Sequence, residues 1–250
     1  MTSNGTEMTD HPSSADHGQA MDRKYRRARH VYDLTRFGFL LGRNRAIQAL
    51  AIQPGKHILE IGCGTGRNLH LMSKRSDNAH FYGLDISEEM LKSATRKLQG
   101  TPNIKLAKAD ASNFSGQELF GKRTFDGILM SFTLSMMPQW HKTLDLALSH
   151  LGPQGVVSIV DFGDFSGFGP LRSWAITELG KHQAPPLPDL WDQIYERTFG
   201  KDGKYYPSLR QAYRGFVQFA TIQKSMNFGK DTNRAHDDVI SPISQPHRKA

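Results

Sequence analysis

Three glycines and two acids between residues 60 and 85 have the types and spacing of a nucleotide-type cofactor site. The run from Glu60 to Asn68 reads Glu-Ile-Gly-Cys-Gly-Thr-Gly-Arg-Asn, between an apolar stretch and a helical one. Gly62, Gly64 and Gly66 allow sharp backbone turns and let the chain approach a ligand without Cβ clashes. The helix that follows would offer free N–H groups. We therefore expect a ligand-binding turn between a buried strand and a helix.

The two acids indicate the charge of the ligand. Glu60 ends the first strand and points into the loop, where a carboxylate would repel a pyrophosphate and suits a cationic group. Asp85 ends the next strand, at the usual ribose-binding position of a doubly wound sheet. Its two oxygens can accept from two hydroxyls, and Ile86 beside it would supply an apolar face for adenine. The alternative is a tight turn that binds no ligand. The two acids at matching strand ends argue against it.

Further candidates stand at the ends of later strands, where open parallel sheets bind their ligands. Asp110 and Ala111 end the third strand, although Asp110 could instead cap the next helix. Ser131 opens the loop after the fourth strand. Asp161 and Asp164 lie at the mouth of the fifth strand, where they could hold a cationic amine or simply face water.

Regular alternation of strand and helix signals surrounds these candidates. Strands are expected near 57–62, 79–84, 104–107, 125–131 and 156–160, helices near 67–74, 87–98, 140–151, 171–181 and 189–200, a turn at 152–155, and a closing hairpin over 204–225. Such alternation predicts an α/β fold with helices on both faces of a mostly parallel sheet. The architecture is Rossmann-like, with seven strands once the hairpin is added.

Composition limits the remaining possibilities. The chain has 250 residues, 38% of them hydrophobic, which predicts one domain with appendages. Residues 1–20 are polar without a signal-peptide core, so we expect a disordered tail there and a polar tail at 226–250. No apolar run reaches the roughly 20 residues that span a bilayer. Cys63 is the only cysteine and fits a reducing cytoplasm as a small buried loop residue. No cluster has metal-ligand spacing, so no metal is expected.

Residues 21–50 carry the sharpest charge asymmetry of a chain whose net charge is +8. They contain eight Lys or Arg and two acids, interleaved with aromatic and aliphatic residues. A basic helix with an apolar stripe is typical of interfacial membrane binding. A nucleic-acid partner or a solvated helix face would also account for the charge.

The pattern Glu-x-Gly-x-Gly-x-Gly resembles the first motif of class I methyltransferases that depend on S-adenosylmethionine (SAM). That cofactor carries an amino-acid head and a sulfonium, which suits the carboxylate of Glu60. The resemblance implies that Asp110 reads the adenine amino group and that the loop at Ser131 touches the methionine moiety. The cofactor-binding residues would then be Glu60, Gly62, Cys63, Gly64, Thr65, Gly66, Asn68, Asp85, Ile86, Asp110, Ala111 and Ser131.

The run from Tyr25 to Arg45, together with the segments 160–164 and 213–216, is similar to the bacterial methyltransferase of betaine-lipid synthesis. That family trimethylates the amine of diacylglycerylhomoserine. The resemblance covers roughly residues 21–225. It implies an N-terminal helical lid over 21–50 and a SAM-binding domain over 51–225, in a cytoplasmic enzyme docked on the inner face of an anionic membrane.

The same resemblance assigns the acceptor site. Tyr25, Tyr32 and Arg36 would meet the lipid headgroup, with Asp161 beside them, and Arg43 or Arg214 would bind its carboxylate. Other acceptors stay open: phosphatidylethanolamine, a quinone ring methylated at carbon, or a nucleic acid, although the Asn/Asp-Pro-Pro-Tyr/Phe motif of base methylation is absent. A regulator that binds SAM without catalysis is a further alternative. Neither the residues nor the resemblance indicates an oligomeric state.

Overall fold

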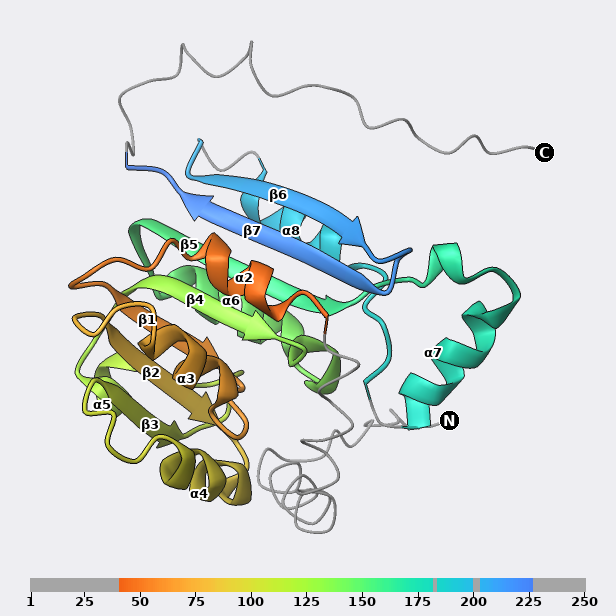
Figure 1. The fold of residues 1–250 in the computed structure, drawn as a ribbon. Helices are drawn as coiled ribbons and strands as arrows, with labels where there is room; N and C mark the ends of the chain where they lie inside the picture. The colour runs from red at the N-terminus through yellow and green to blue at the C-terminus, as the bar shows by residue number, and fades with distance from the viewer. Residues whose placement is uncertain (1–40, 182–183, 200–202, 227–250) are drawn as a thin grey trace, which may run out of the picture.

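The computed structural model describes residues 41–181, 184–199 and 203–226, which build a seven-stranded sheet (Figure 1). The strands are β1 (His57–Ile61), β2 (His80–Asp85), β3 (Ile104–Lys108), β4 (Phe125–Ser131), β5 (Leu151–Phe162), β6 (Tyr205–Ala212) and β7 (Val217–Lys224). Their order in the sheet is β3-β2-β1-β4-β5-β7-β6. Strands β1 to β5 run parallel to one another, and β7 is antiparallel to both β5 and β6.

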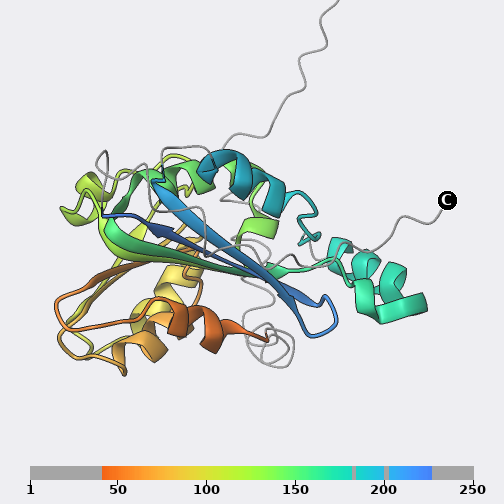
Figure 2. The same cartoon turned by 90° about the horizontal axis from the view of Figure 1, so that it is seen from above.

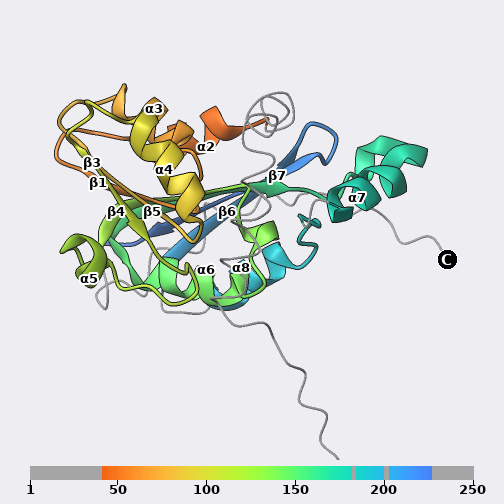
Figure 3. The same ribbon diagram turned by 90° about the horizontal axis from the view of Figure 1, so that it is seen from below.

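Helices cover both faces of the sheet. They are α2 (Arg43–Ala49), α3 (Arg67–Ser73), α4 (Glu88–Lys97), α5 (Gly116–Phe120), α6 (Trp140–Ser149), α7 (Arg172–Lys181) and α8 (Leu190–Thr198), with short 3-10 helices η1 (Leu134–Met136) and η2 (Ser166–Leu171). Figures 2 and 3 show α2, α3 and α4 on one face and α5, α6 and α8 on the other. The α7 helix projects beyond the sheet instead of covering it (Figure 1).

Burial on both faces explains why the central strands are apolar almost throughout, as is usual for parallel strands between two helical layers. In β1, Leu59 and Ile61 pack into the core under α6 and α8, whereas Ile58 packs into the opposite core under α2 and α3. β1 and β4 are neighbours in the sheet but not in the sequence, and the strand order reverses between them. A switch of this kind opens a crevice at the carboxyl ends, where ligands bind in such sheets.

The structure confirms the α/β class, the seven strands and the closing hairpin, whose strands β6 and β7 pair antiparallel. The predicted turn at 152–155 is wrong as a strand boundary, because β5 already begins at Leu151. Phe125 pairs with Leu151 and Gly127 pairs with Val156, so the residues between them bulge out of a continuous strand. The short α5 helix was not predicted; it has five residues and is capped by Ser115.

Parts of the expected N-terminal lid can be located. Residues 1–40 lie outside the described residues, as do 227–250 of the expected tail. Within 41–50, α2 packs on the sheet: Ala46 and Ile47 are fully buried, and the Ser158 hydroxyl of β5 donates to the Ala46 carbonyl at 2.9 Å. This last part of the segment is therefore a fixed layer of the fold. No helix in the described ranges is long and apolar enough to cross a membrane.

Candidate active site

The glycine turn after β1 is held against two neighbouring segments. The amides of Gly62 and Cys63 both donate to the Leu84 carbonyl of β2, at 2.9 and 3.0 Å. Gly62 has a φ of +71°, and a Cβ at this position would lie 2.0 Å from Oγ1 of Thr133 in the loop after β4. Only glycine fits here, because both the backbone conformation and the close approach exclude a side chain.

The crest of the turn faces open space beside Asp85. A Cβ on Gly64 would meet no heavy atom within 4 Å. The Gly64 amide donates to Oδ2 of Asp85 at 2.8 Å, and the Ser87 amide donates to Oδ1 at 2.9 Å. These bonds fix the carboxylate at the end of β2, where each oxygen can accept from more than one donor. The arrangement fits a ligand whose ribose hydroxyls meet Asp85.

Glu60 lies beneath the turn and is 2% exposed. Its Oε1 accepts from Nδ2 of Asn68 at 2.7 Å, whereas its Oε2 has no hydrogen-bond partner among the described residues. Burial raises the pKa of Glu60 to about 8, although the Asn68 bond and the nearby Arg43 charge oppose the rise. A buried carboxyl with an unpaired oxygen is a fitting partner for the cationic amino group of a ligand.

The remaining cofactor candidates lie around the same crevice. Ile86 is half-buried and packs with Met90 and Met136, which makes an apolar wall beside Asp85. Met136 of η1 was not among the predicted residues; the signal for it is an apolar methionine pair in the loop after β4. Ser131 is buried at the end of β4, and its hydroxyl has no hydrogen-bond partner in the part of the chain that the structure describes.

Asp110 forms a turn of its own rather than a helix cap. Its Oδ1 accepts from the Ser112 amide and hydroxyl, both at 2.8 Å, while Ser115 caps α5 by accepting from the Glu118 amide. The neighbouring Ala111 is 6% exposed and belongs to the core under α6. Asp110 is thus half-buried just after β3, and its reading of the adenine amino group stays a prediction.

Two loop residues have plainer roles. Cys63 is 5% exposed, and burial raises the pKa of its thiol well above the usual value, with Asp85 and Glu60 adding to the rise. A thiol held neutral in this way is no nucleophile, which agrees with the expected small buried loop residue. The Thr65 hydroxyl accepts from Nζ of Lys97 at 3.1 Å, on the outer side of the turn.

Asp161 was expected at the mouth of β5, near the acceptor or facing water. It is instead 1% exposed: Oδ2 accepts from the Ser135 amide at 3.1 Å and Oδ1 from the Phe162 amide at 2.9 Å. Burial raises its pKa against these hydrogen bonds. The carboxyl therefore ties η1 to β5 as a positioning residue, and the expectation that it faces water is wrong. Its companion Asp164 accepts from the Ser166 amide at 2.9 Å in the next turn.

The other expected acceptor residues, Tyr25, Tyr32 and Arg36, lie outside the described residues, so their contacts with the headgroup stay predictions. No group of three or more His, Cys, Asp or Glu in the described ranges could hold a metal ion.

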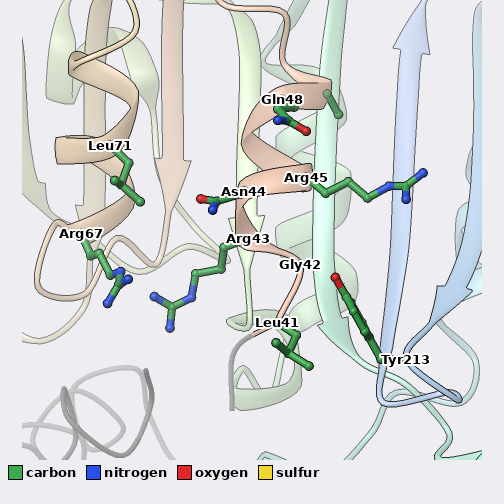
Figure 4. A pocket seen from close by; sticks show the side chains of 10 residues that line it. Leu41, Gly42, Arg43, Asn44, Arg45, Gln48, Arg67, Leu71 and Tyr213 are labelled. Atoms are coloured by element: carbon green, nitrogen blue, oxygen red, sulfur yellow. The ribbon is translucent and has the colours of Figure 1, made fainter. Parts of the chain in front are cut away.

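A hollow of about 860 Å³ adjoins the glycine turn (Figure 4). Arg67, the residue directly after Gly66, lines it, and so does Arg43, whose charge acts on Glu60. The full lining is Leu41, Gly42, Arg43, Asn44, Arg45, Gln48, Ala49, Arg67, Leu71 and Tyr213. These described residues include three arginines and no acid, so the hollow is a basic one.

The arginines of the hollow are not equivalent. Figure 4 shows Arg43 of α2 and Arg67 of α3 reaching into the same space, whereas Arg45 extends in the opposite direction. The Arg45 guanidinium lies over the Phe219 ring of β7, 5.6 Å from its centre. Sequence reasoning singled out Arg43 but missed Arg67 and Tyr213, because the hollow is assembled from α2, α3 and the β6–β7 turn, which are far apart in the chain.

Comparisons with known proteins find similarity to methyltransferases. Residues 58–155 match the family described as methyltransferase domain. A demethylmenaquinone methyltransferase of Desulfitobacterium hafniense is 32% identical over 133 residues, which cover 51% of either chain. A malonyl-[acyl-carrier protein] O-methyltransferase of Halalkalibacterium halodurans is 26% identical over 91% of this chain and 86% of the relative. The chain thus spans about half the length of the first of these relatives.

Solved structures share the fold. The plantazolicin methyltransferase BpumL in complex with SAH superposes with a TM-score of 0.64 at 19% identity, covering 85% of this chain and 95% of that one. The DhpI–SAH complex superposes with a TM-score of 0.59 over 86% of this chain. The contacts of the glycine turn, Glu60 and Asp85 with the amino-acid head and ribose of SAM stay predictions. Residues 58–155 thus match the methyltransferase domain family, and the described residues share the fold of a methyltransferase solved with SAH.

Proposed function

We propose that the protein methylates the headgroup amine of a membrane lipid that also carries an anionic group, most directly diacylglycerylhomoserine, to give the trimethyl betaine lipid. The observation that carries the proposal is the basic hollow beside the glycine turn, which Arg43 and Arg67 enter from two helices. The resemblance of the N-terminal run to the enzyme of betaine-lipid synthesis supports the same acceptor.

Guanidinium groups bind carboxylates and phosphates through forked, charge-assisted hydrogen bonds. Two of them in a hollow whose described lining has no acid favour an acceptor with such an anion. In diacylglycerylhomoserine the carboxylate and the amine share one carbon, so holding the carboxylate at Arg43 and Arg67 would place the amine close to the glycine turn. Phosphatidylethanolamine offers a phosphate instead, farther from its amine.

The relatives bear on the choice through their names. Malonyl-[acyl-carrier protein] and trans-aconitate methyltransferases are named for acid-bearing substrates, which suit arginines. Demethylmenaquinone methyltransferases are also similar to this chain, and they favour carbon methylation of a quinone ring as the second candidate function. A quinol ring has no carboxylate or phosphate for Arg43 and Arg67 to bind.

The chain's part in the transfer is to position and desolvate the acceptor. A primary amine with a pKa of about 10 is mostly protonated at neutral pH, so it must lose a proton before it can attack. The described residues near the turn offer no exposed carboxylate dedicated to this step, since Asp161 is buried and bonded to backbone amides. A nearby Asp or Tyr, or bulk water, takes the proton, and orientation of the acceptor by the arginines contributes to catalysis.

The test is transfer of labelled methyl from SAM to detergent-dispersed diacylglycerylhomoserine, phosphatidylethanolamine, a demethylated quinol and DNA. We expect label in the homoserine lipid, building to a trimethyl product. Label confined to phosphatidylethanolamine would overturn the headgroup assignment, and label confined to the quinol would establish the second candidate.

Arginine variants sharpen this assay. Arg43→Gln or Arg67→Gln should lower kcat/KM for the homoserine lipid roughly tenfold to a hundredfold, the usual value of a charge-assisted hydrogen bond. Arg45→Gln is the matched control, because its guanidinium lies over Phe219 and points away. The Kd of SAM, titrated separately for each variant, distinguishes loss of acceptor binding from loss of cofactor binding.

A further inference from the structure

Large apolar side chains are exposed to solvent at the junction of η2 and α7. Residues 169–174 are all exposed; among them Leu171 is 60% and Trp174 65% exposed. Figures 1 and 3 show α7 projecting beyond the carboxyl end of β5, clear of the sheet. Exposed apolar residues that cluster in this way mark surfaces that bind a partner or a membrane.

The segment from η2 to α7 is fixed to the rest of the fold where it begins. Its exposed side chains therefore form a defined surface. The amides of Phe165 and Gly167 donate to the carbonyls of Gly215 and Arg214, at 2.9 and 3.0 Å. Nε of Arg172 donates to the Asp164 carbonyl at 2.8 Å. On the inner side of α7, Ala175 is buried in the core that contains Phe162 and Phe165, and the partly buried Ile176 and Leu179 pack against this core.

The same end of the molecule gathers further apolar and basic residues. The β6–β7 turn adds Tyr213, 51% exposed, and the exposed Arg214. Leu41 at the hollow is 43% exposed. The other large exposed apolar residues of the described ranges lie elsewhere, on α8 and at the far ends of β6 and β7; they are Tyr195, Phe199, Tyr206 and Met226.

We propose that this surface, made of Leu171, Arg172, Trp174, Tyr213 and Arg214, docks on an anionic phospholipid bilayer. Charge complementarity selects this occupant: arginines alternate with the apolar side chains, and the chain as a whole carries +8. Tryptophan and tyrosine rings prefer the level of the lipid headgroups, and arginines beside them attract anionic lipids. The proposed docking rests on the proposed function only in one respect: a lipid acceptor would explain why the protein binds a membrane.

Trp174 is a built-in reporter, since Trp140 is buried and Trp191 has its indole nitrogen buried. We expect vesicles of phosphatidylglycerol and phosphatidylcholine to shift the emission to the blue, and brominated phosphatidylcholine to quench it. Trp174→Phe should remove both signals while keeping vesicle binding. Binding without any shift or quenching that depends on Trp174 would overturn the proposal.

A double variant tests the binding itself. Leu171→Ser with Trp174→Ser should weaken co-sedimentation with anionic vesicles roughly tenfold or more, because two large side chains lose apolar burial. The matched control is Tyr195→Ser with Phe199→Ser, which removes side chains of similar exposure from α8 and should leave binding unchanged.

Equal losses in the two double variants, or no loss in the first, would refute docking through α7. Methyl transfer to detergent-dispersed homoserine lipid separates this result from the proposed function. We expect the Leu171/Trp174 double variant to keep that activity, and a wild-type protein that binds vesicles but methylates no lipid would disprove the function and leave the docking intact.

Discussion

Replacing Glu60 by Gln should abolish a proton release that accompanies SAM binding to the wild-type protein. Glu60 is buried beneath the glycine turn with a pKa raised to about 8, chiefly by desolvation. At pH 7 about nine tenths of such a carboxyl is protonated. A cationic amino group placed beside it favours the ionised form, so binding should release about 0.9 proton.

The same linkage fixes the pH dependence of affinity. Between about pH 5.5 and 7 the proton on Glu60 must leave before the cation can be paired, so SAM affinity should rise toward tenfold per pH unit, or about 1.4 kcal/mol. Glu60→Gln keeps the amide contact to Asn68 but has no proton to lose. Its affinity should be weaker at pH 7 and nearly flat over this range.

Stability without SAM should change in the opposite direction. A carboxyl whose folded pKa is raised from 4.5 to about 8 favours the folded state most strongly below its unfolded pKa, and this contribution is lost as pH rises toward 8. At pH 7 the loss is roughly 3 kcal/mol, 1.36 kcal/mol for each unit above 4.5. Glu60→Gln should unfold at a nearly constant temperature across this window, whereas the wild type should become less stable.

Calorimetric titration in buffers of different ionisation enthalpy measures the released protons, and thermal unfolding without ligand measures the stability. Protons from the ligand itself cancel in the difference between wild type and variant. Asp126→Asn is the control, because Asp126 pairs with Lys56 at 2.9 Å at the opposite end of the strands. Equal proton release by wild type and Glu60→Gln would refute the reasoning.

Three further predictions concern the turn and the N-terminal segment. Asp85→Asn should weaken SAM binding roughly tenfold to a hundredfold in a calorimetric titration, because a charged acceptor of ribose hydroxyls is lost. Gly62→Ala should lower the free energy of unfolding by more than about 2 kcal/mol in denaturant melts, since its Cβ would lie 2.0 Å from Oγ1 of Thr133. Charge reversal of Arg26, Arg27 and Arg29, three of the arginines in residues 21–50, should weaken binding to anionic vesicles at low salt.

Each of these has an internal comparison. Gly100→Ala matches Gly62→Ala, because Gly100 also has a positive φ, +85°, but no heavy atom within 4 Å of its Cβ position. Similar destabilisation of the two would mean that the Thr133 contact costs nothing. Wild-type SAM affinity in Asp85→Asn would remove Asp85 from the ribose site. Unchanged vesicle binding after the arginine reversals would leave these three arginines without a role in docking.

Local sequence patterns were enough to predict the elements around the glycine turn. Buried apolar strands such as β4, a serine cap such as Ser87 and glycines with positive φ have causes within a few residues of themselves. The bulge in β5 and the burial of Asp161 could not be predicted in this way, because they depend on partners far along the chain. Leu151 joins the sheet only because Phe125 pairs with it, and Asp161 turns inward only because the amide of Ser135 lies in reach.

The basic hollow shows the same limit at the scale of a site. Arg43 and Arg67 are 24 positions apart in the sequence, and Tyr213 is far from both. They come together because α2 is fixed on the sheet by the buried Ala46 and Ile47, while α3 begins where the glycine turn ends. Sequence patterns can indicate that these residues are basic or aromatic, but only the packing of α2 makes them face one hollow.

We expect acceptor choice to depend largely on residues outside the matched family segment. The matched family segment, 58–155, contains the glycine turn, Asp85, Asp110 and Ser131. Relatives of this chain are named for a quinone, an acyl-carrier protein and an aconitate. A domain found in relatives with such different names does not by itself indicate which acceptor is methylated. In this chain, most of the basic hollow and the whole exposed α7 surface come from residues before 58 and after 155. Exchanging those flanks between relatives, rather than altering the glycine turn, should therefore change which acceptor is methylated.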